Sequence, residues 1–279
     1  MSIVILTYIV ALALAVATWF VAPVESLLVR ALLADVVATA VVFAASARYR
    51  NSSLYDPYWS VAPLALLIPF FPITSWSLTT LLIIGSIGWW GVRLTVNWIL
   101  RWRGLEDEDW RYAELNEQSG RWYALVNFFG IHLFPTLLVF AGMIPALLAL
   151  QTSREPSMLE WIAAAICVSA ILIEGFSDRQ LRRFLATRQS RAEQLDQGLW
   201  AWSRHPNYFG EVLFWWGLFL FGWSATGNWW LVVGPIAMTL LFLLYSVPAM
   251  DRRMLSSNPE YARRMESVSG LIPWPPRRS

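Results

Sequence analysis

Residues 198–223 read GLWAWSRHPNYFGEVLFWWGLFLFGW, where a polar stretch runs directly into an apolar one. Pro206 is suited to open a helix there, because a proline in the first turn lacks only an N–H that has no intrahelical partner. In such a helix Asn207 and Glu211 lie on one face, one turn apart. An ionisable side chain at the mouth of a membrane helix is costly unless it is paired, and it indicates function by default. The stretch therefore predicts a polar site where a membrane helix meets water.

The composition of the whole chain indicates a polytopic membrane protein. Hydrophobic residues make up 57% of the 279 residues and charged residues 14%, and the mean hydropathy is +0.48. We expect an all-α fold with about seven or eight transmembrane helices. The predicted spans are 3–22, 28–47, 61–73, 77–100, 124–150, 158–177, 208–225 and 229–248. Segment 61–73 is short and rich in proline, which predicts a tilted or broken span.

The positions of the arginines predict how the chain is oriented in the membrane. The chain has no lysine, so all 21 basic residues are arginine, as is typical of a GC-rich bacterial genome. With eight spans, almost all arginines outside the spans fall on the side of the N-terminus, in segments 48–60, 101–123 and 178–207 and in the C-terminal tail. Loops rich in Arg stay in the cytoplasm. We expect an integral protein of the bacterial cytoplasmic membrane with both termini in the cytoplasm.

Helical spacing places further polar residues on shared faces. The stripes are Arg93, Asn97 and Arg101 in the fourth span and Glu174, Asp178 and Arg182 at the end of the sixth. Both descend toward the side that carries Asn207, which is typical of the walls of a site for a large polar ligand. Arg182, Arg183, Arg188 and Arg191 equally suit contacts with anionic lipid head groups.

Several other polar residues predict structure rather than chemistry. Arg30 and Asp35 are spaced so that they face each other poorly on one helix, and His132 is typical of a hydrogen-bonded packing residue. The single cysteine, Cys167, excludes an internal disulfide. The sequence has no phosphate-binding glycine loop, no metal-ligand spacing and no basic repeat for nucleic acid. We therefore expect neither a metal nor a nucleic-acid partner.

A group of motifs resembles the DUF1295 branch of the steroid 5α-reductase superfamily. The motifs are WSRHPNYFGE at 202–211, PAMDRRML at 248–255, NPEYARRM at 258–265, LIPWPP at 271–276, YDPYWSVAP at 55–63 and EDWRY at 108–112. The resemblance runs from about residue 51 to about residue 276. It divides the chain into N-terminal transmembrane helices at 1–50 and a reductase-like membrane domain at 51–279, which act as one functional domain.

The resemblance implies a membrane-embedded NADPH-dependent reductase whose cofactor cavity opens to the cytoplasm. Asn207 and Glu211 match the residues that hold the nicotinamide–ribose end, and Asp178 and Arg182 match a cofactor-binding acid and arginine. The other matching cofactor positions are Arg93, Arg103, Arg204, His205, Tyr208, Arg252 and Tyr261. The implied reaction transfers a hydride to a C=C bond conjugated to a carbonyl in a lipidic substrate, which is steroid-like, isoprenoid or acyl.

The residue that polarises the carbonyl departs from the pattern of the family. Steroid 5α-reductases use a Gln-Glu pair where this chain reads Leu54-Tyr55-Asp56-Pro57-Tyr58, and their tyrosine position falls near Trp90. We nominate Tyr55, Asp56 or Tyr58 as the acid, with Glu211 also counted among the catalytic residues. The alternative interpretation of this stretch is an interfacial anchor with a turn at Asp56.

Two other classes of function remain open at this stage. The RHPxY string also occurs in membrane methyltransferases of the isoprenylcysteine type, which use S-adenosylmethionine. The several arginines suit a phosphorylated dinucleotide better than the positive sulfonium of that methyl donor. The second alternative is a protein that binds or transports lipids. The expected partners are a lipidic small molecule and membrane lipids; the substrate, the proton donor and the oligomeric state stay open.

Overall fold

The computed structural model describes residues 1–152, 155–190 and 193–276, so Arg154 and Arg191 lie outside the described residues. Within these ranges the regular elements are all helices, with one isolated β-bridge between Ser203 and Ser269. Six helical segments of the described chain are long and apolar enough to cross a membrane. They are Ser2–Val21, Leu27–Tyr49, Leu78–Ile99, Trp110–Ala149, Met158–Thr187 and Trp229–Ser257. The predicted all-α, polytopic membrane fold is confirmed.

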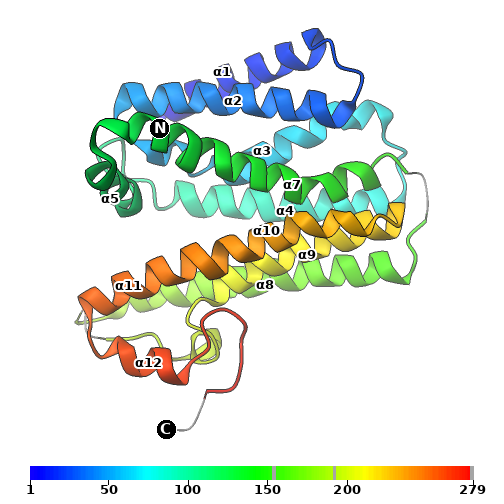
Figure 1. Cartoon of the computed structure of the whole chain (residues 1–279). Coiled ribbons are helices and arrows are strands. Elements are labelled where there is room, and N and C mark those ends of the chain that lie inside the picture. Colours follow the sequence, from blue (N-terminus) through cyan, green and yellow to red (C-terminus); the bar gives the residue numbers. More distant parts are fainter. Residues whose placement is uncertain (153–154, 191–192, 277–279) are drawn as a thin grey trace. The chain divides into compact units, whose positions relative to one another are not determined.

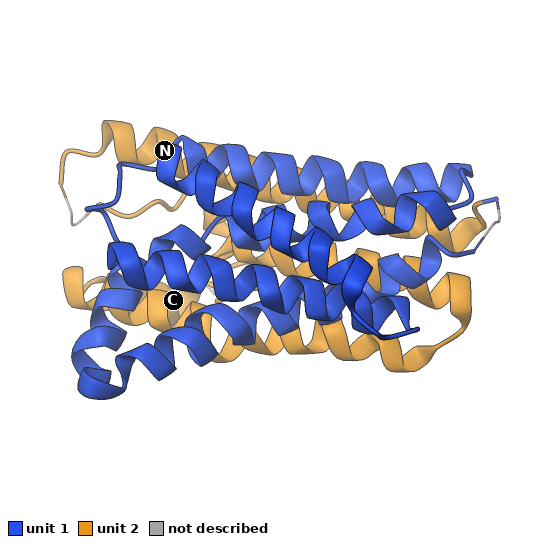
Figure 2. Cartoon of the chain, turned by 90° about the horizontal axis from the view of Figure 1, so that it is seen from above, with its two compact units in different colours: residues 1–155 blue, residues 156–279 orange. Residues whose placement is uncertain are grey.

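The chain divides into two compact units, residues 1–155 and residues 156–279 (Figure 2). Unit 1 contains α1 (Ser2–Val21), α2 (Leu27–Tyr49), α3 (Tyr58–Leu67), α4 (Leu78–Ile99), α5 (Trp110–Ser119), α6 (Tyr123–Val126) and α7 (Phe134–Ala149). Unit 2 contains α8 (Met158–Thr187), α9 (Pro206–Thr226), α10 (Val233–Leu241), α11 (Val247–Ser257) and α12 (Tyr261–Ser267).

Local sequence signals account for where several helices begin. Ser26 and Ser77 cap α2 and α4 by accepting a backbone N–H from the first turn. Ser157 and Glu160 form a reciprocal capping box at the start of α8. Pro206 is the first residue of α9, as predicted, and His205 precedes it as the N-cap residue.

The prolines of the predicted third span break it into two pieces. α3 is only 10 residues long and contains Pro63, and a 3-10 turn at Ile68–Ile73 with Pro69 and Pro72 continues the segment. A proline inside a helix removes a hydrogen bond and clashes with the preceding turn, so the chain changes to a tighter helix here. The predicted irregularity of this span is confirmed.

The acidic and Arg-rich segment at 101–123 contains a helix, in line with its interpretation as a solvated helix or loop. Asp109 caps α5 by accepting the N–H of Arg111. A π-helical turn at Asn127–Leu133 separates α6 from α7. Such turns insert one extra residue and occur often at functional sites.

In unit 2, α8 and α9 run antiparallel and pack closely along their length (Figure 1). Glycines on α9 allow this approach, since a Cβ at Gly210 would lie 2.8 Å from the carbonyl oxygen of Ala170 and one at Gly217 would collide with Cys167. The buried Cys167 therefore packs in the interior of unit 2. α8 extends ten residues beyond the predicted span 158–177, which gives Asp178 and Arg182 a helical support.

Candidate functional site

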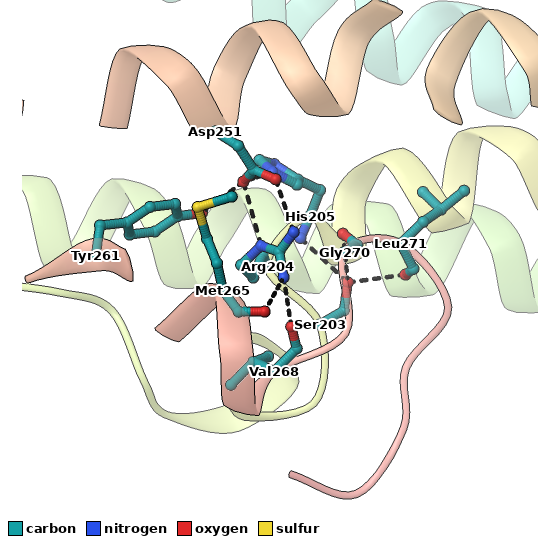
Figure 3. Close-up of polar contacts among 9 residues, drawn as sticks. All are labelled: Ser203, Arg204, His205, Asp251, Tyr261, Met265, Val268, Gly270 and Leu271. Atoms are coloured by element: carbon teal, nitrogen blue, oxygen red, sulfur yellow. Dashed lines mark hydrogen bonds and ion pairs between the residues drawn. The ribbon is translucent and has the colours of Figure 1, made fainter. Parts of the chain in front are cut away.

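A polar cluster just before α9 is centred on Asp251 of α11 (Figure 3). Arg204 donates from Nη2 to Asp251 Oδ2 at 2.7 Å and from Nε to Asp251 Oδ1 at 3.2 Å. Both side chains are almost buried, with 10% and 6% of their surface exposed. A two-point guanidinium–carboxylate pair of this kind fixes the orientation of both groups.

Two further residues of the sequence motifs converge on the same carboxylate. His205 Nε2 lies 2.9 Å from Asp251 Oδ1, and the hydroxyl of Tyr261 donates to that oxygen, also at 2.9 Å. Burial and the neighbouring Asp251 carboxylate raise the pKa of the Tyr261 phenol above its usual range, so the phenol stays protonated as a donor. We name this group of Arg204, His205, Asp251 and Tyr261 the Asp251 cluster.

The Asp251 cluster fastens the C-terminal tail to the segment before α9. Arg204 Nη1 donates to the carbonyls of Met265 and Val268, and the Ser203 hydroxyl donates to the carbonyl of Leu271 at 2.8 Å (Figure 3). The backbone N–H of Arg204 also donates to the carbonyl of Ser269 at 2.8 Å. The motifs at 202–211 and 258–276 are therefore two parts of one folded region.

The first turn of α9 presents Asn207 and Glu211, the two residues that the sequence predicts on one face. The side-chain oxygen Oδ1 of Asn207 is buried and accepts no hydrogen bond from the described residues. Glu211 is buried and accepts the indole N–H of Trp215 at 3.0 Å. A Cβ at Gly210, between them in sequence, would lie 2.9 Å from the Cβ of Glu174 on α8. Asn207 thus has an acceptor that no described residue uses.

The stripe on α8 grades from buried to exposed. Glu174 is 5% exposed, Asp178 is half-buried and Arg182 is exposed. On α11 the side chain of Arg252 is exposed as well. Tyr208 is half-buried and stacks on the ring of His205, with ring centroids 5.2 Å apart.

The predicted basic positions of unit 1 lie at the end of α4 and after it. Arg93 is half-buried and Asn97 is buried. Arg101 lies beyond the last residue of α4 and donates from Nε to the carbonyl of Asn97 at 3.3 Å. Arg103 is exposed in the following loop. The helical stripe predicted for Arg93, Asn97 and Arg101 is therefore helical only as far as Asn97.

Tyr55 and Tyr58 lie in a buried hydrogen-bonded network within unit 1. The hydroxyl of Tyr58 donates to Asp35 Oδ1 at 2.6 Å, and the hydroxyls of Tyr55 and Thr39 each lie 2.8 Å from Thr136 Oγ1. The rings of Tyr55 and Tyr58 stack with centroids 5.2 Å apart. We name this group of Asp35, Thr39, Tyr55, Tyr58 and Thr136 the Asp35 network.

His132 of the π-helical turn continues this buried polar region. Its Nδ1 lies 3.0 Å from the carbonyl of Asn127, and its Nε2 lies 3.1 Å from the hydroxyl of Ser46. A carbonyl only accepts, so Nδ1 carries the hydrogen and Nε2 accepts from Ser46. The prediction that His132 is a hydrogen-bonded packing residue is confirmed.

Asp56 lies beside α5 and the loop before it. Its Oδ1 accepts the hydroxyl of Tyr112 at 2.7 Å. Burial raises the pKa of the Asp56 carboxyl to about 7, and the hydrogen bond from Tyr112 opposes part of that rise. Asn51 and Ser52 bind the same loop, through Leu105 and Glu108. The three nominated acids therefore belong to two different hydrogen-bonded groups.

Sequence reasoning missed both carboxylates on which these groups are centred. Asp251 stands inside the motif PAMDRRML, and its partners His205, Arg204 and Tyr261 are 46, 47 and 10 residues away in sequence. The sequence analysis noted that Asp35 and Arg30 face each other poorly on one helix. In the structure the partner of Asp35 is Tyr58, 23 residues further on. The sequence signal that could have identified Asp35 was an acidic residue standing alone in an apolar span.

The chain was compared with known proteins. The family model described as "Protein of unknown function (DUF1295)" matches residues 42–268. The chain is 26% identical over 212 residues to the uncharacterized protein C594.04c of Schizosaccharomyces pombe. That alignment covers 65% of this chain and 60% of the relative, so the chain spans about 60% of the length of that protein. No solved structure matches.

Proposed function

The chain belongs to the DUF1295 family, and from this premise we propose that it is a membrane-embedded reductase that uses NADPH. Its substrate is a lipid in which a C=C bond is conjugated to a carbonyl, of steroid-like, isoprenoid or acyl type. NADPH supplies the hydride when it is bound. The residues of the chain hold the cofactor and polarise the carbonyl oxygen of the substrate.

The observation that carries this proposal is the side chain of Asn207. Its Oδ1 is a buried acceptor without a partner among the described residues, in the first turn of α9. Leaving a buried polar atom without a partner costs about 1–3 kcal/mol. The carboxamide N–H groups of a nicotinamide have the complementary donor chemistry. Asn207 and Glu211 therefore fit the nicotinamide–ribose end of the cofactor.

The phosphate end of the cofactor is assigned to exposed arginines. Arg182 on α8 and Arg252 on α11 are exposed, and a guanidinium binds phosphate oxygens through two parallel hydrogen bonds. Asp178, one turn before Arg182, is the cofactor-binding acid that the family resemblance implies. Arg93 and Arg103 are further arginines with this chemistry.

The Asp251 cluster refines the roles of three of the predicted cofactor residues. Arg204, His205 and Tyr261 already bind Asp251 in the structure. We therefore assign them to holding the segment from which α9 begins, so that Asn207 keeps a fixed position. The ring of Tyr208 is half-buried and stacks on the ring of His205.

The proton-donating end of the reaction is assigned to the Asp35 network. Tyr55 and Tyr58 are buried and supply hydroxyls within an apolar surrounding, where a hydrogen bond to a developing enolate oxygen is stronger than in water. Asp56 is hydrogen-bonded to Tyr112 of α5, which favours the two tyrosine positions over Asp56.

The test is ligand binding by purified protein in detergent, measured as a shift in thermal unfolding. A ligand at 100 times its dissociation constant adds about 2.7 kcal/mol to the stability of the folded state. We expect stabilisation by NADPH, loss of that shift in Asn207→Ala, and an unchanged shift in the control Asn228→Ala at the exposed opposite end of α9.

Three outcomes contradict the proposal. Stabilisation by S-adenosylmethionine alone assigns the chain to the methyltransferases. A shift by NADPH that Asn207→Ala leaves intact removes the assignment of Asn207 and Glu211. The absence of a shift with NADPH, NADH and S-adenosylmethionine leaves lipid binding or transport as the function.

A further inference from the structure

The C-terminal tail of unit 2 exposes large apolar side chains, although it lies outside every predicted span. Trp274 is 68% exposed and Ile272 is 60% exposed, and Trp202, just before α9, is 48% exposed. Residues 267–276 read SVSGLIPWPP and contain no charged residue. Exposed apolar side chains that gather in one place mark a contact with another protein or with a membrane.

Hydrogen bonds hold these exposed side chains next to one another. The backbone N–H of Trp274 donates to the carbonyl of Trp202 at 3.0 Å, and an isolated β-bridge pairs the same two segments. The hydroxyl of Ser203 donates to the carbonyl of Leu271 at 2.8 Å (Figure 3). Ser203 and Leu271 are buried, whereas their neighbours Trp202 and Ile272 are exposed. We name the group of Trp202, Ile272 and Trp274 the tail patch.

The length of α8 indicates where unit 2 leaves the membrane. About 20 helical residues cross the hydrocarbon core of a bilayer, so a crossing that starts at Met158 ends near Ser177, as the predicted span 158–177 does. α8 continues to Thr187, and Asp178 and the exposed Arg179 are the first residues after this point. The level of Ser177 is therefore the level of the lipid headgroups.

Two hydrogen bonds fasten the segment of Trp202 to α8 at this level. The indole N–H of Trp200 donates to the carbonyl of Ser177 at 3.1 Å, and the backbone N–H of Leu199 donates to Gln180 Oε1 at 3.1 Å. Trp202 follows Trp200 by two residues, which span at most about 7 Å of chain. The tail patch therefore lies close to the level at which α8 leaves the hydrocarbon core.

We propose that the tail patch inserts into the headgroup region of the bilayer on the side where α8 ends. Tryptophan favours this region, because its apolar ring contacts acyl chains while its N–H remains in contact with water. Pro273, Pro275 and Pro276 suit the same place, because proline has no backbone N–H that would need a partner there. The inference concerns a lipid contact and does not depend on the reductase function.

The insertion anchors the segment from which α9 begins. The backbone N–H of Arg204 donates to the carbonyl of Ser269 at 2.8 Å, so the tail is bonded to this segment between the tail patch and the Asp251 cluster. Asn207 follows only three residues later, in the first turn of α9. The lipid contact thus fixes the depth at which the polar site of unit 2 meets the membrane surface.

The test is the membrane depth of a nitroxide on a single cysteine, measured by electron paramagnetic resonance. Cys167, the one native cysteine, is buried and is replaced by alanine. Ile272→Cys then takes the label in full-length protein in vesicles of phosphatidylethanolamine and phosphatidylglycerol. Oxygen collects among acyl chains and a nickel chelate stays in water, so their collision rates with the label give its depth. We expect a depth of about 5–10 Å at the boundary of headgroups and acyl chains.

Two control positions in unit 2 calibrate this depth. Val168→Cys lies on an exposed part of α8 in the middle of the predicted span, so its label should collide mainly with oxygen. Ser256→Cys is exposed near the end of α11, so its label should collide mainly with the nickel chelate. The label at position 272 should lie between these two.

Substitution of the tryptophans tests what holds the label there. We expect the double variant Trp202→Ser and Trp274→Ser to move the label at position 272 toward water, while the backbone bond between the two residues remains possible. The matched control is Trp229→Ser, which removes an indole that is 75% exposed beyond the other end of α9. It should leave the depth at position 272 unchanged.

Three results overturn the inference. A nickel-chelate collision rate at position 272 as high as that at position 256 places the tail patch in water. Exclusion of both reagents from the label assigns the patch to a protein contact, with a second copy of the chain or with another protein. An unchanged depth in the double variant shows that the tryptophans do not hold the tail in lipid.

Discussion

Asp251 and Asp35 are both 4% exposed, yet their surroundings treat the carboxyl group in opposite ways. Asp251 accepts hydrogen bonds from an arginine, a tyrosine and a histidine nitrogen. Asp35 accepts one hydroxyl, and the structure gives it no cation among the described residues. A buried carboxyl keeps its charge where arginine can reach it, and keeps its proton where it cannot. The comparison separates a buried carboxyl that is held by an arginine from one that is held by a hydroxyl.

The largest effect on stability should follow from a substitution of Asp251, the carboxyl that is paired with an arginine. Asp251→Asn leaves the guanidinium of Arg204 buried without a counter-charge, and removing one partner of a buried pair costs about 3–5 kcal/mol. We expect a correspondingly large fall in thermal stability, together with faster proteolysis of the tail after residue 257. The matched control is Ser256→Ala on the exposed side of α11, which should change stability by less than about 0.5 kcal/mol. Equal stability of Asp251→Asn and wild type would show that the cluster does not fasten the tail.

A smaller effect on stability should follow from a substitution in the Asp35 network, which contains no arginine. Thr136→Val removes the group that contacts the hydroxyls of Tyr55 and Thr39. Hydrogen bonds between membrane helices contribute about 0.6 kcal/mol on average and about 1.7 kcal/mol at most, so we expect a loss within that range. Thr18→Val is the control, because the Thr18 hydroxyl only donates to Leu14 on the exposed face of α1. The measurement is unfolding in mixed detergent, and a loss as large as that of Asp251→Asn would contradict the distinction between the two clusters.

The smallest effect concerns Asp56, which belongs to neither cluster. Its folded-state pKa of about 7 lies above the ordinary value of 3.8, so the folded protein binds its proton more tightly than the unfolded chain does. The resulting stabilisation is complete below pH 3.8 and is lost as the pH rises through about 7. Because Asp56 is half-buried, water screens part of the effect. We expect the unfolding temperature to fall by roughly 2–4 °C, the equivalent of about 1 kcal/mol.

The variant Asp56→Asn checks the origin of that pH dependence. It keeps the size of the side chain and a partner for Tyr112, but it has no titrating carboxyl. We expect its unfolding temperature to lack this fall over the same pH range. A pH dependence that persists unchanged in Asp56→Asn would assign the effect to another group.

Features of the fold that depend on neighbours in sequence were predicted well. The proline at 206 opens α9, the prolines of 61–73 break the third span, and the long apolar runs form helices. Such features follow from backbone sterics and from the cost of exposing polar backbone groups to hydrocarbon. The shared helical face of Asn207 and Glu211 is of the same kind, whereas their role in binding NADPH stays a proposal.

Partners that lie far apart in sequence were not predicted. Spacing along one helix indicated that Arg30 and Asp35 face each other poorly, but it did not reveal Tyr58, which the tertiary structure brings to Asp35. Arg204, His205 and Tyr261 were each assigned to the cofactor, and the structure shows that all three bind Asp251. Periodicity shows which residues share a face, but it contains no information about which other helix packs on that face.

The sequence by itself determined the membrane class, the helices and the family to which this protein belongs, because apolar run lengths, caps and motifs are local properties. The tertiary structure decided which buried carboxyl meets a guanidinium and which meets only a hydroxyl. That difference depends on whether a guanidinium lies within hydrogen-bond distance, and only the packing of helices distant in sequence sets that distance.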